Sequence, residues 1–385
     1  MLGRAFLLSL AVSWVGCGSS DETFVGELSA PVVYGTDDRF EVYDEPDPEL
    51  QRIARESIVA LIQSFRLIPL SGGNYGISAL SLQEERGLCD DERFANQPVA
   101  ASCSGTLIDD DLVLTAGHCI SPDRPCGSFN YVFNFYLDGP DLLAPIRDED
   151  VYRCKRVVLE RDAPTDAVTP DFVVIQLDRP VEGNHAPIEF RPAAVPLAKA
   201  DPLSMIGFGS GLPAKIDSGA RVAEPPTPER DYFIANLDAF EGHSGSSIYD
   251  SSHRLSGILL GGRVPDYVTA PDENCARVNV FDDSQAGEVA HDIATIVKAL
   301  CDDGWERDNV CEVAACQGDN CGTPSPTPDA GVDGVPADKS GCSAAVPTQG
   351  PGSLWLGLGL WLFAREFRRR GASRRRGPPG RASSH

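Results

Sequence analysis

The sequence has few basic residues, and this scarcity limits its partners. The 385 residues include 33 lysines and arginines against 57 aspartates and glutamates, a formal net charge of −24. Residues 343–385 hold eight of the arginines and one glutamate, so the rest of the chain carries 25 basic against 56 acidic residues. Nucleic acids and anionic lipid surfaces attract proteins through positive charge. The acidic body therefore argues against both as partners and favours solubility.

The sequence also lacks an apolar run that comfortably spans a bilayer, which takes about 20 residues. The first run, residues 5–15 after Arg4, has the length of the apolar core of an export signal. The second run, residues 354–364, precedes the arginine triplets 368–370 and 374–376, which would hold that end in the cytoplasm. We therefore expect an exported protein whose two ends determine its localisation and take no part in its chemistry.

Histidine is missing from the most cysteine-dense part of the chain. The twelve cysteines of an exported chain indicate an oxidising compartment. Four of them lie within residues 301–321, at the start of a proline- and aspartate-rich stretch that reads as a stalk over 301–341. Such spacing is compatible with a metal knuckle, but without histidine and in an oxidising compartment two disulfides are the better interpretation. We expect no metal site.

Two short motifs about 125 residues apart carry the candidate chemistry. Residues 115–119, Thr-Ala-Gly-His-Cys, place His118 after an apolar run, and residues 242–246, Gly-His-Ser-Gly-Ser, place Ser244 between glycines. A serine hydroxyl needs a base within hydrogen-bond reach and a third group that orients this base. Asp171 begins an apolar segment between the two motifs, whereas the nearby Asp166 precedes no such segment. We interpret Ser244 as nucleophile, His118 as general base and Asp171 as the orienting carboxylate.

The order His, Asp, Ser along the chain resembles the chymotrypsin/trypsin family of serine proteases. Further segments resemble that family in the same order, over roughly residues 50–300. They are the Cys-Ser-Gly-Thr-Leu-Ile strand at 103–108, the Asp-initiated strand at 171–180, Gly-Phe-Gly at 207–209, and the pocket-lining strand at 257–262. The pattern around Ser244 is closer to bacterial members such as the glutamyl endopeptidases.

This resemblance implies an all-β fold of two antiparallel six-stranded β-barrels with a C-terminal helix and the active site between the barrels. It implies a disulfide between Cys103 and Cys119, and an oxyanion hole made by the backbone N–H groups of Gly242 and Ser244. Apolar residues that share one helical face predict the final helix over 284–300. His185, His253 and His291 have no catalytic context, and we expect them at the surface.

Activation and specificity follow from departures and matches within the resemblance. His243 stands where trypsin has an aspartate that pairs with a freshly cut amino terminus, and no Arg-Ile-Val-Gly-Gly sequence is present. We therefore expect no trypsin-style activation, and activity in a chain that begins near Pro48.

Asp238 lies six residues before Ser244, where trypsin keeps the carboxylate at the floor of its specificity pocket. Gly261 and Gly262 fall where glycines leave that pocket open. These matches imply cleavage after Arg or Lys. A purely structural Asp238 remains the alternative, because glutamyl-type relatives can carry an aspartate here too. The histidine by which those relatives read glutamate is replaced by Leu259.

The expected organisation has five parts. Residues 1–17 are a signal peptide, 18–49 an acidic linker or pro-segment, 50–300 the protease domain, 301–341 the stalk and 342–385 a sorting or anchor tail. The end of the signal resembles a bacterial lipoprotein box with Cys17 acylated; an ordinary signal peptide is the alternative. Cys342, the short apolar run and the arginine cluster resemble a MYXO-CTERM sorting tail processed at Cys342; a weak permanent anchor is the alternative.

The expected function is that of a serine endopeptidase outside the cytoplasm. It would cleave protein or peptide substrates through an acyl-enzyme on Ser244, with no metal or organic cofactor. Membrane attachment through the terminal cysteines and handling by C-terminal sorting machinery would place it in the cell envelope, on the surface, or released outside. The alternatives are a catalytically silent surface binding module and an esterase with the same triad.

Overall fold

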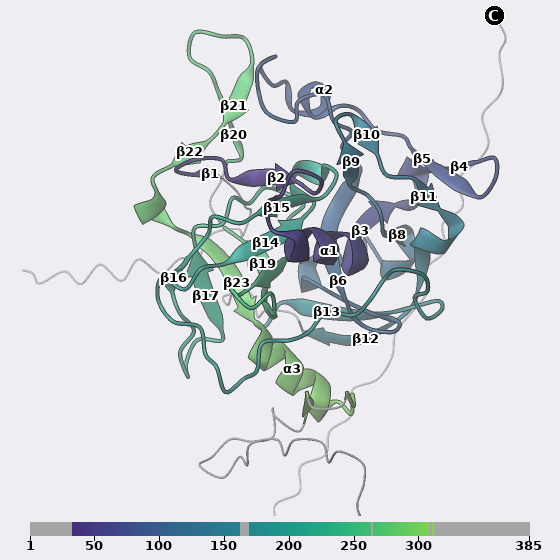
Figure 1. Ribbon diagram of the computed structural model, residues 1–385, viewed down its shortest axis with the longest axis vertical. Coiled ribbons are helices and arrows are strands. Elements are labelled where there is room, and N and C mark those ends of the chain that lie inside the picture. Colours follow the sequence, from purple (N-terminus) through teal and green to yellow (C-terminus); the bar gives the residue numbers. More distant parts are fainter. Residues whose placement is uncertain (1–32, 162–168, 263–264, 308–309, 312–385) are drawn as a thin grey trace, which may run out of the picture. The chain divides into compact units, whose positions relative to one another are not determined.

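Strands dominate the computed structural model, which describes residues 33–161, 169–262, 265–307 and 310–311 (Figure 1). Six strands close into a barrel in the order β12-β13-β7-β6-β3-β8, and every neighbouring pair is antiparallel. The barrel strands are β3 (Ile58–Gln63), β6 (Ala101–Asp109), β7 (Leu112–Thr115), β8 (Phe129–Val132), β12 (Val151–Arg161) and β13 (Phe172–Leu177).

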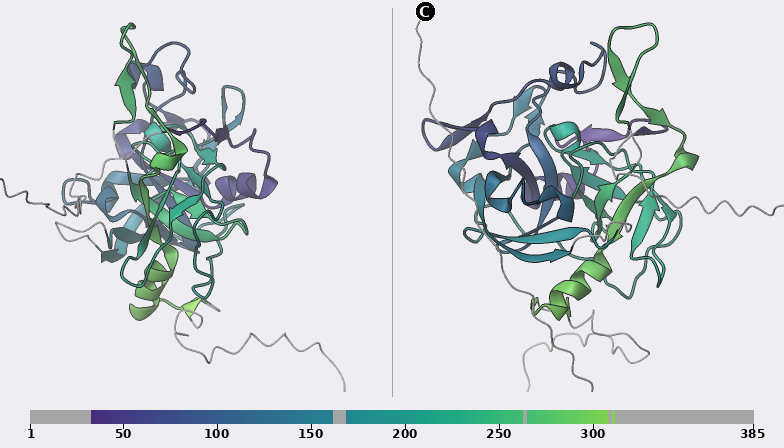
Figure 2. Two further views of the ribbon diagram at one scale, coloured as in Figure 1. Left: turned by 90° about the vertical axis from the view of Figure 1, so that its left-hand side faces the viewer. Right: turned by 180° about the vertical axis from the view of Figure 1, so that it is seen from behind.

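The second half is an eight-stranded antiparallel sheet in the order β16-β17-β23-β19-β18-β14-β15-β2. Its strands are β2 (Arg39–Glu41), β14 (Ser204–Gly207), β15 (Lys215–Asp217), β16 (Val222–Glu224), β17 (Tyr232–Ala235), β18 (Ser247–Tyr249), β19 (Leu255–Gly261) and β23 (Glu288–Asp292). The barrel and the sheet lie side by side, with the last helix at one end of both (Figure 2).

The remaining elements are short and lie outside the barrel and the eight-stranded sheet. They are the parallel pair β1 (Val33–Tyr34) and β22 (Val280–Phe281), the sheet of β4 (Leu67–Leu70), β5 (Asn74–Ile77) and β11 (Ile146–Arg147), the pair β9 (Leu137–Gly139) and β10 (Leu142–Leu143), the hairpin β20 (Tyr267–Thr269) and β21 (Ala276–Val278), and the helices α1 (Pro48–Glu56), α2 (Leu82–Arg86) and α3 (Ile293–Asp302). None of the helices in the described ranges is long and apolar enough to span a bilayer.

The expected fold class is confirmed: an all-β, two-barrel type of fold with a helix near its C-terminal end. The second half differs in detail, because it is an eight-stranded sheet and not a closed six-stranded barrel among the described residues. The reason lies partly in β2, which adds to the sheet by pairing with β15 (Ile216 opposite Phe40).

The N-terminal segment therefore corrects the expected organisation. Residues 18–49 were expected to form a linker or pro-segment, but the described part, 33–49, contributes β1, β2 and the start of α1. Asp47 caps α1 by accepting from the Glu49 N–H, and Leu50 and Ile53 are buried beneath that helix. Residues 33–49 belong to the folded domain.

The C-terminal boundary also moves. A disulfide joins Cys301 at the end of α3 to Cys311. The Trp305 indole N–H donates to Asp109 on β6 at 2.7 Å, and Arg307 donates to the carbonyl of Ile108 at 2.5 Å. The first described residues of the expected stalk thus pack on the barrel. Cys316, Cys321, Cys17 and the tail with Cys342 lie outside the described residues.

The final helix is shorter than predicted because pairing overrides its periodicity. Helix was predicted over 284–300, but residues 288–292 form β23, which pairs with both β17 and β19. Asp292 then caps α3 by accepting from the Ala294 N–H. The apolar residues Ile293, Ile296, Val297 and Leu300 are buried as a single face.

Candidate active site

The ends of two barrel strands bring His118 to Asp171. β7 ends at Thr115 and β13 begins at Phe172, and Thr115 lies opposite Val173 in the ladder. His118 follows β7 in a short 3-10 turn, and Asp171 immediately precedes β13. Between them, Gly117 leaves no room for a side chain, because a Cβ there would lie 2.5 Å from Asp171 Oδ1.

Both oxygens of Asp171 hold His118. Oδ1 accepts from the His118 backbone N–H at 2.9 Å, and Oδ2 lies 2.7 Å from the ring Nδ1. An acceptor at Nδ1 places the ring proton there and leaves Nε2 with a lone pair. Asp171 is buried, whereas 41% of the His118 side chain is exposed. The carboxylate therefore orients an imidazole that remains accessible from one side.

Ser244 completes the arrangement from the other half of the fold. Its Oγ lies 2.8 Å from His118 Nε2. The serine sits before β18, and the following Gly245 donates its N–H to Leu259 on β19 at 2.8 Å. Gly245 has φ +81°, and a Cβ would meet the Ser104 carbonyl at 2.2 Å, so glycine is needed there. The three predicted triad residues thus lie in one hydrogen-bonded chain.

The segment before Ser244 presents two backbone donors. Gly242 has φ +97°, and its carbonyl points to the barrel, where it accepts from the Ser104 hydroxyl of β6 at 2.9 Å. Within the described ranges, neither the Gly242 N–H nor the Ser244 N–H donates to a protein acceptor. These are the two groups expected to form an oxyanion hole, and both are available to a ligand.

Ser104 is a site residue that sequence reasoning missed. Its buried hydroxyl donates to the Gly242 carbonyl and accepts from the Phe208 N–H at 3.0 Å. Its backbone N–H also donates to the Ser244 carbonyl at 2.9 Å. A usable signal was present, because Ser104 replaces a glycine of the Cys-Gly-Gly pattern that this segment resembles. β6 of the first barrel thus holds the serine segment of the second half in place.

His243 is buried and neutral. Only 1% of it is exposed, and its Nδ1 accepts from the Phe240 N–H at 2.9 Å. Burial, with the nearby Arg39 and Lys215, lowers its pKa to about 3. Its ring occupies the space beside Gly209, where a Cβ would lie 2.2 Å from it. His243 therefore closes the turn before Ser244 with a neutral hydrogen bond and no ion pair.

Asp238 corrects the expected pocket floor. Its Oδ1 accepts from the Tyr34 N–H at 2.8 Å and its Oδ2 from the Asp38 N–H at 3.0 Å. Its own N–H donates to Asp217, and the residue is only 2% exposed. Both oxygens are thus directed at the N-terminal segment. Burial, and then the neighbouring Asp217, raise the pKa of Asp238. Its role in this structure is to anchor residues 34–38.

A different carboxylate lies beside the pocket glycines. Gly261 ends β19 and Gly262 follows it directly. An added Cβ on Gly262 would lie 1.9 Å from Oε2 of Glu288, a fully buried residue at the start of β23. The Tyr34 hydroxyl donates to Glu288 Oε1 at 3.0 Å. Glycine at 262 therefore makes room for a carboxylate, which sequence reasoning did not single out.

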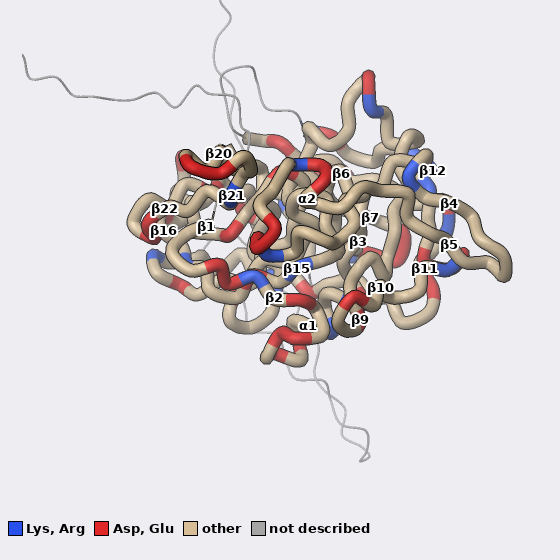
Figure 3. Tube along the Cα trace, turned by 90° about the horizontal axis from the view of Figure 1, so that it is seen from above, with Lys and Arg blue, Asp and Glu red and all other residues tan. Residues whose placement is uncertain are grey.

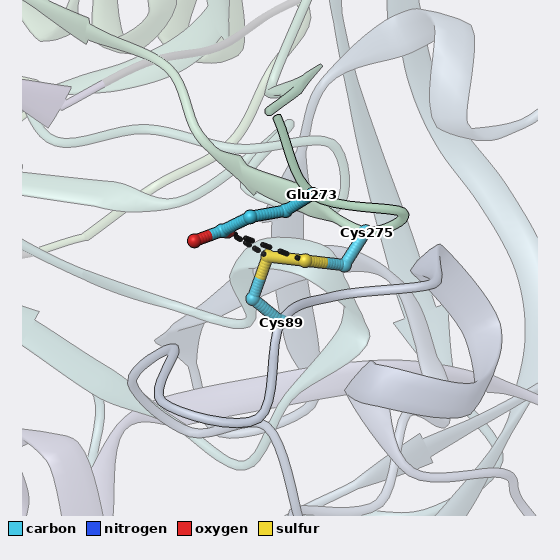
Figure 4. Close-up of side chains that lie close together, drawn as sticks. All are labelled: Cys89, Glu273 and Cys275. Carbon is cyan, nitrogen blue, oxygen red and sulfur yellow. Dashed lines mark hydrogen bonds between the residues drawn. A yellow bond between two sulfur atoms is a disulfide. The ribbon is translucent and has the colours of Figure 1, made fainter. Parts of the chain in front are cut away.

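Four disulfides join the described cysteines. Cys103–Cys119 is the one that the resemblance implies, and it ties β6 to the turn that carries His118. Cys89–Cys275, Cys126–Cys154 and Cys301–Cys311 are the others. The Glu273 carboxylate lies 3.2 Å from Cys89 Sγ (Figure 4). This group resembles a ligand set, but sulfurs bonded to each other are not the thiolates that bind metal.

We expected the other histidines at the surface, and this prediction was wrong for His185 and His291. His291 is fully buried, edge-on to Phe172 and 4.0 Å from an Asp231 oxygen. His185 is 3.1 Å from Asp150, with 6% of its side chain exposed. His253 lies 2.8 Å from Asp47 and is half-buried. These histidines contact carboxylates or aromatic rings from distant segments, and such contacts have no local sequence signature.

Two comparisons with known proteins found a match. Residues 103–258 match the family described as "Trypsin-like peptidase domain". No curated protein matches the sequence. Among solved structures, one titled "Structure of Glu endopeptidase in complex with MPD" matches with 17% sequence identity and a TM-score of 0.40, covering 70% of this chain and 98% of that chain. The matched residues, 103–258, include His118, Asp171 and Ser244.

Proposed function

We propose that this protein is a serine endopeptidase that acts outside the cytoplasm through Ser244, His118 and Asp171. The observation that carries the proposal is the continuous chain from Asp171 Oδ2 to His118 Nδ1 and from His118 Nε2 to Ser244 Oγ, at 2.7 and 2.8 Å. Such a chain can take up the serine proton while the hydroxyl attacks a carbonyl carbon. The disulfides of the described domain support an oxidising compartment outside the cytoplasm.

In the proposed reaction, His118 first takes up a proton and then gives it back, and the other groups support both steps. Ser244 Oγ attacks the scissile carbonyl as His118 Nε2 takes its proton, and Asp171 stabilises the imidazolium. The N–H groups of Gly242 and Ser244 bind the oxyanion, with each such donor contributing about 3–4 kcal/mol in this chemistry. The imidazolium then gives its proton to the leaving amine. Water attacks the resulting acyl-enzyme by the same steps and releases the acid.

A preference for Arg or Lys before the scissile bond remains part of the proposal, with a different residue as its support. Gly245 is bonded to Leu259 on β19, and three residues further on Gly262 packs against the Glu288 carboxylate. At about 3.3 Å per strand residue, Gly262 lies about 10 Å beyond Leu259 along the chain. A buried carboxylate beside Gly262 would favour a cationic side chain.

Attachment through Cys17 and processing at Cys342 stay proposals that the described residues do not bear on. Together they would tether the protease at the cell envelope, where its substrates would be proteins or peptides and its tail a substrate of the sorting machinery. Mass spectrometry of the protein purified from its own host would test both at once. Intact residues 1–17 and 342–385 would count against them.

An active-site fluorophosphonate probe and a diverse peptide library test the function itself. The full chain should react with the probe at Ser244 and cleave peptides, and Ser244→Ala should do neither. A surface binding module would give no labelling. An esterase would react with the probe and hydrolyse esters but leave matched peptides intact. In the peptides that are cleaved, Glu288→Gln should reduce a preference for Arg or Lys, whereas Asp238→Asn should leave the preference in place.

A further inference from the structure

A polar pocket of about 190 Å³ opens beside the oxyanion segment. It is lined by Gly242 and Glu241 of that segment, by Ala101 and Ser102 of β6, and by three arginines from three separate segments. These arginines are Arg66 after β3, Arg86 on α2, and Arg124 six residues after His118. The lining includes no residue of β19 or β23, so this pocket is separate from the region of Gly262 and Glu288.

The charges of this arginine pocket are only partly balanced. Arg86 is paired with Glu241 at 2.5 Å. Arg66 and Arg124 form no ion pair with any described carboxylate, and Glu85 is the one other acid in the lining. An excess of positive charge is unusual in a chain with a net charge of −24, although Figure 3 shows acidic and basic positions interspersed along the Cα trace. The excess points to an anionic ligand.

Two hydrogen bonds hold the unpaired arginines in position. Arg66 Nη1 donates to the Val99 carbonyl at 2.9 Å, and Arg124 Nη2 donates to the His118 carbonyl at 3.1 Å. Each guanidinium keeps its remaining N–H donors for another acceptor. α2, which carries Arg86, ends shortly before Cys89, and the disulfide to Cys275 ties this part of the chain to the β20–β21 hairpin. The walls are therefore anchored before any ligand binds.

The position of the pocket relative to the triad assigns it to one side of the substrate. His118 protonates the leaving amine, so the substrate segment after the scissile bond lies on the His118 side. Arg124 is bonded to the His118 carbonyl, and Ser102 precedes the disulfide that fixes the same turn. The acyl side instead faces β19 beside Ser244.

We infer that the arginine pocket binds a carboxylate of the substrate segment that follows the scissile bond. This inference rests on the proposed function and adds a second specificity site to it. Arginine stays charged over the working pH range and matches a carboxylate with two parallel donors. The carboxylate can be an Asp or Glu side chain or the C-terminus of a short substrate, and both present the same group to the pocket.

Matched peptides distinguish these two sources. A parent peptide with an amidated C-terminus and glutamine at the first three positions after the cleaved bond serves as reference. Glutamate is then placed at each of the three positions in turn, and in a separate series the amide is replaced by a free carboxylate. We expect one acidic position, or the free terminus at one length, to raise kcat/KM by about three- to tenfold, and the gain to shrink in high salt.

Variants connect the preference to the pocket. Arg124→Gln and Arg66→Gln should each reduce the acidic preference, and Arg124→Glu should turn it toward lysine at the same position. Cleavage of the glutamine parent reports the catalytic machinery in each variant. Arg156→Gln is the matched control, because Arg156 is an exposed β12 arginine bonded to Gln176 outside the pocket.

Binding to Ser244→Ala tests the pocket without catalysis. Fluorescent peptides that carry the best acidic segment, and their glutamine counterparts, are titrated against Ser244→Ala and against Ser244→Ala with Arg124→Gln. Tighter binding of the acidic peptide that disappears with Arg124→Gln supports the inference. Equal binding of both peptides overturns it. If peptides are cleaved without any acidic preference, the inferred role of the arginine pocket is wrong, whereas the proposed protease function is supported. If acidic peptides bind but no peptide is cleaved, the pocket is supported and the protease function is wrong.

Discussion

The two halves of the described domain differ in the residues that their strands bury. On the six strands of the closed barrel, none of the buried residues is charged, and β13 buries five of its six residues. The eight-stranded sheet instead buries charges on three of its strands: Arg39 and Glu41 on β2, Lys215 and Asp217 on β15, and Glu288 and Asp292 on β23. In the proposed mechanism, the barrel supplies the base and its carboxylate, and the sheet side supplies the nucleophile.

The two halves hold their groups of the proposed triad by different means. The barrel places His118 and Asp171 through strand pairing over an apolar core, which is insensitive to pH. The sheet side positions the segment before Ser244 through buried polar groups that must stay paired. Arg39 stacks on the Phe240 ring at 4.0 Å and binds Asp37, while Asp238 holds the backbone of residues 34 and 38. The nucleophile therefore depends on the N-terminal segment.

The largest effect should come from removing one catalytic group from either half. His118→Ala and Ser244→Ala should each lower kcat/KM by about 10⁴- to 10⁶-fold. The double variant should be about as active as the less active single variant, because the groups act as a unit. Steady-state kinetics on one peptide measures this. Ser252→Ala, an exposed serine near β18, is the control. A loss below tenfold in Ser244→Ala would reject the triad.

Loss of the N-terminal segment should disable one half and spare the other. A chain that begins at Pro48, which the sequence alone suggested would be active, lacks β2 and the two N–H donors of Asp238. Buried charges left without partners cost about 3–5 kcal/mol for each broken pair. We expect loss of activity and faster hydrogen exchange in the sheet, with the barrel strands still protected. A chain that begins at residue 31 is the control, and full activity from Pro48 would contradict the proposed dependence.

Single buried substitutions should affect stability differently in the two halves. Lys215 is fully buried, with its Nζ 3.2 Å from Glu41 and 2.8 Å from Gln97, and burial lowers its pKa to about 8. Lys215→Met should lower the free energy of unfolding by about 3–5 kcal/mol, because the Glu41 carboxylate loses its cation and keeps only the hydrogen bond from the Gln97 amide. Glu41→Gln in the same chain should recover much of this loss.

In the barrel, Ile175→Val should cost only about 0.5–1.5 kcal/mol, with no partner substitution able to recover it. Denaturant unfolding of the three variants measures these values. Equal losses for Lys215→Met with and without Glu41→Gln would show that the ion pair is not the cause.

The smallest effect should be a pH dependence of the free energy of unfolding that arises from the sheet side. Burial and Asp217 raise the pKa of Asp238 above its ordinary 3.8, so the folded state keeps a proton that the unfolded state has lost. The stabilisation from this retained proton is fully present below pH 3.8, and it is lost as the pH rises toward the pKa of Asp238 in the folded state. Stability should therefore fall by up to about 1 kcal/mol per pH unit between pH 5 and 7.

Asp238→Asn should reduce this slope, even if it lowers stability at every pH. Thermal or denaturant unfolding at several pH values measures it, with the exposed Asp123→Asn variant reporting the effect of charge alone. An unchanged slope in Asp238→Asn would assign the pH dependence to other groups.

Much of the site could be read from short motifs, because each motif carries its local geometry with it. The glycines around Ser244, the cysteine after His118 and the aspartate before an apolar strand identified the residues that the structure brings within hydrogen-bond distance. Ser104 and Glu288 were missed because their contacts join segments far apart in the chain. Gly262 was predicted to leave a substrate pocket open. In the structure the Glu288 carboxylate lies beside it, and this neighbour could not be read from the local sequence.

What the sequence determined by itself is the chemistry available: a nucleophile, a base, an orienting carboxylate, paired cysteines, and strands whose apolar residues had to be buried. Tertiary structure alone decided how the acidic residues are used. Asp238 became an anchor for residues 34–38, and the segment expected to be a linker became an edge strand, because backbone N–H groups and buried carboxylates must find partners wherever the fold brings them together. Such partnerships depend on distances in space, which spacing along the chain does not encode.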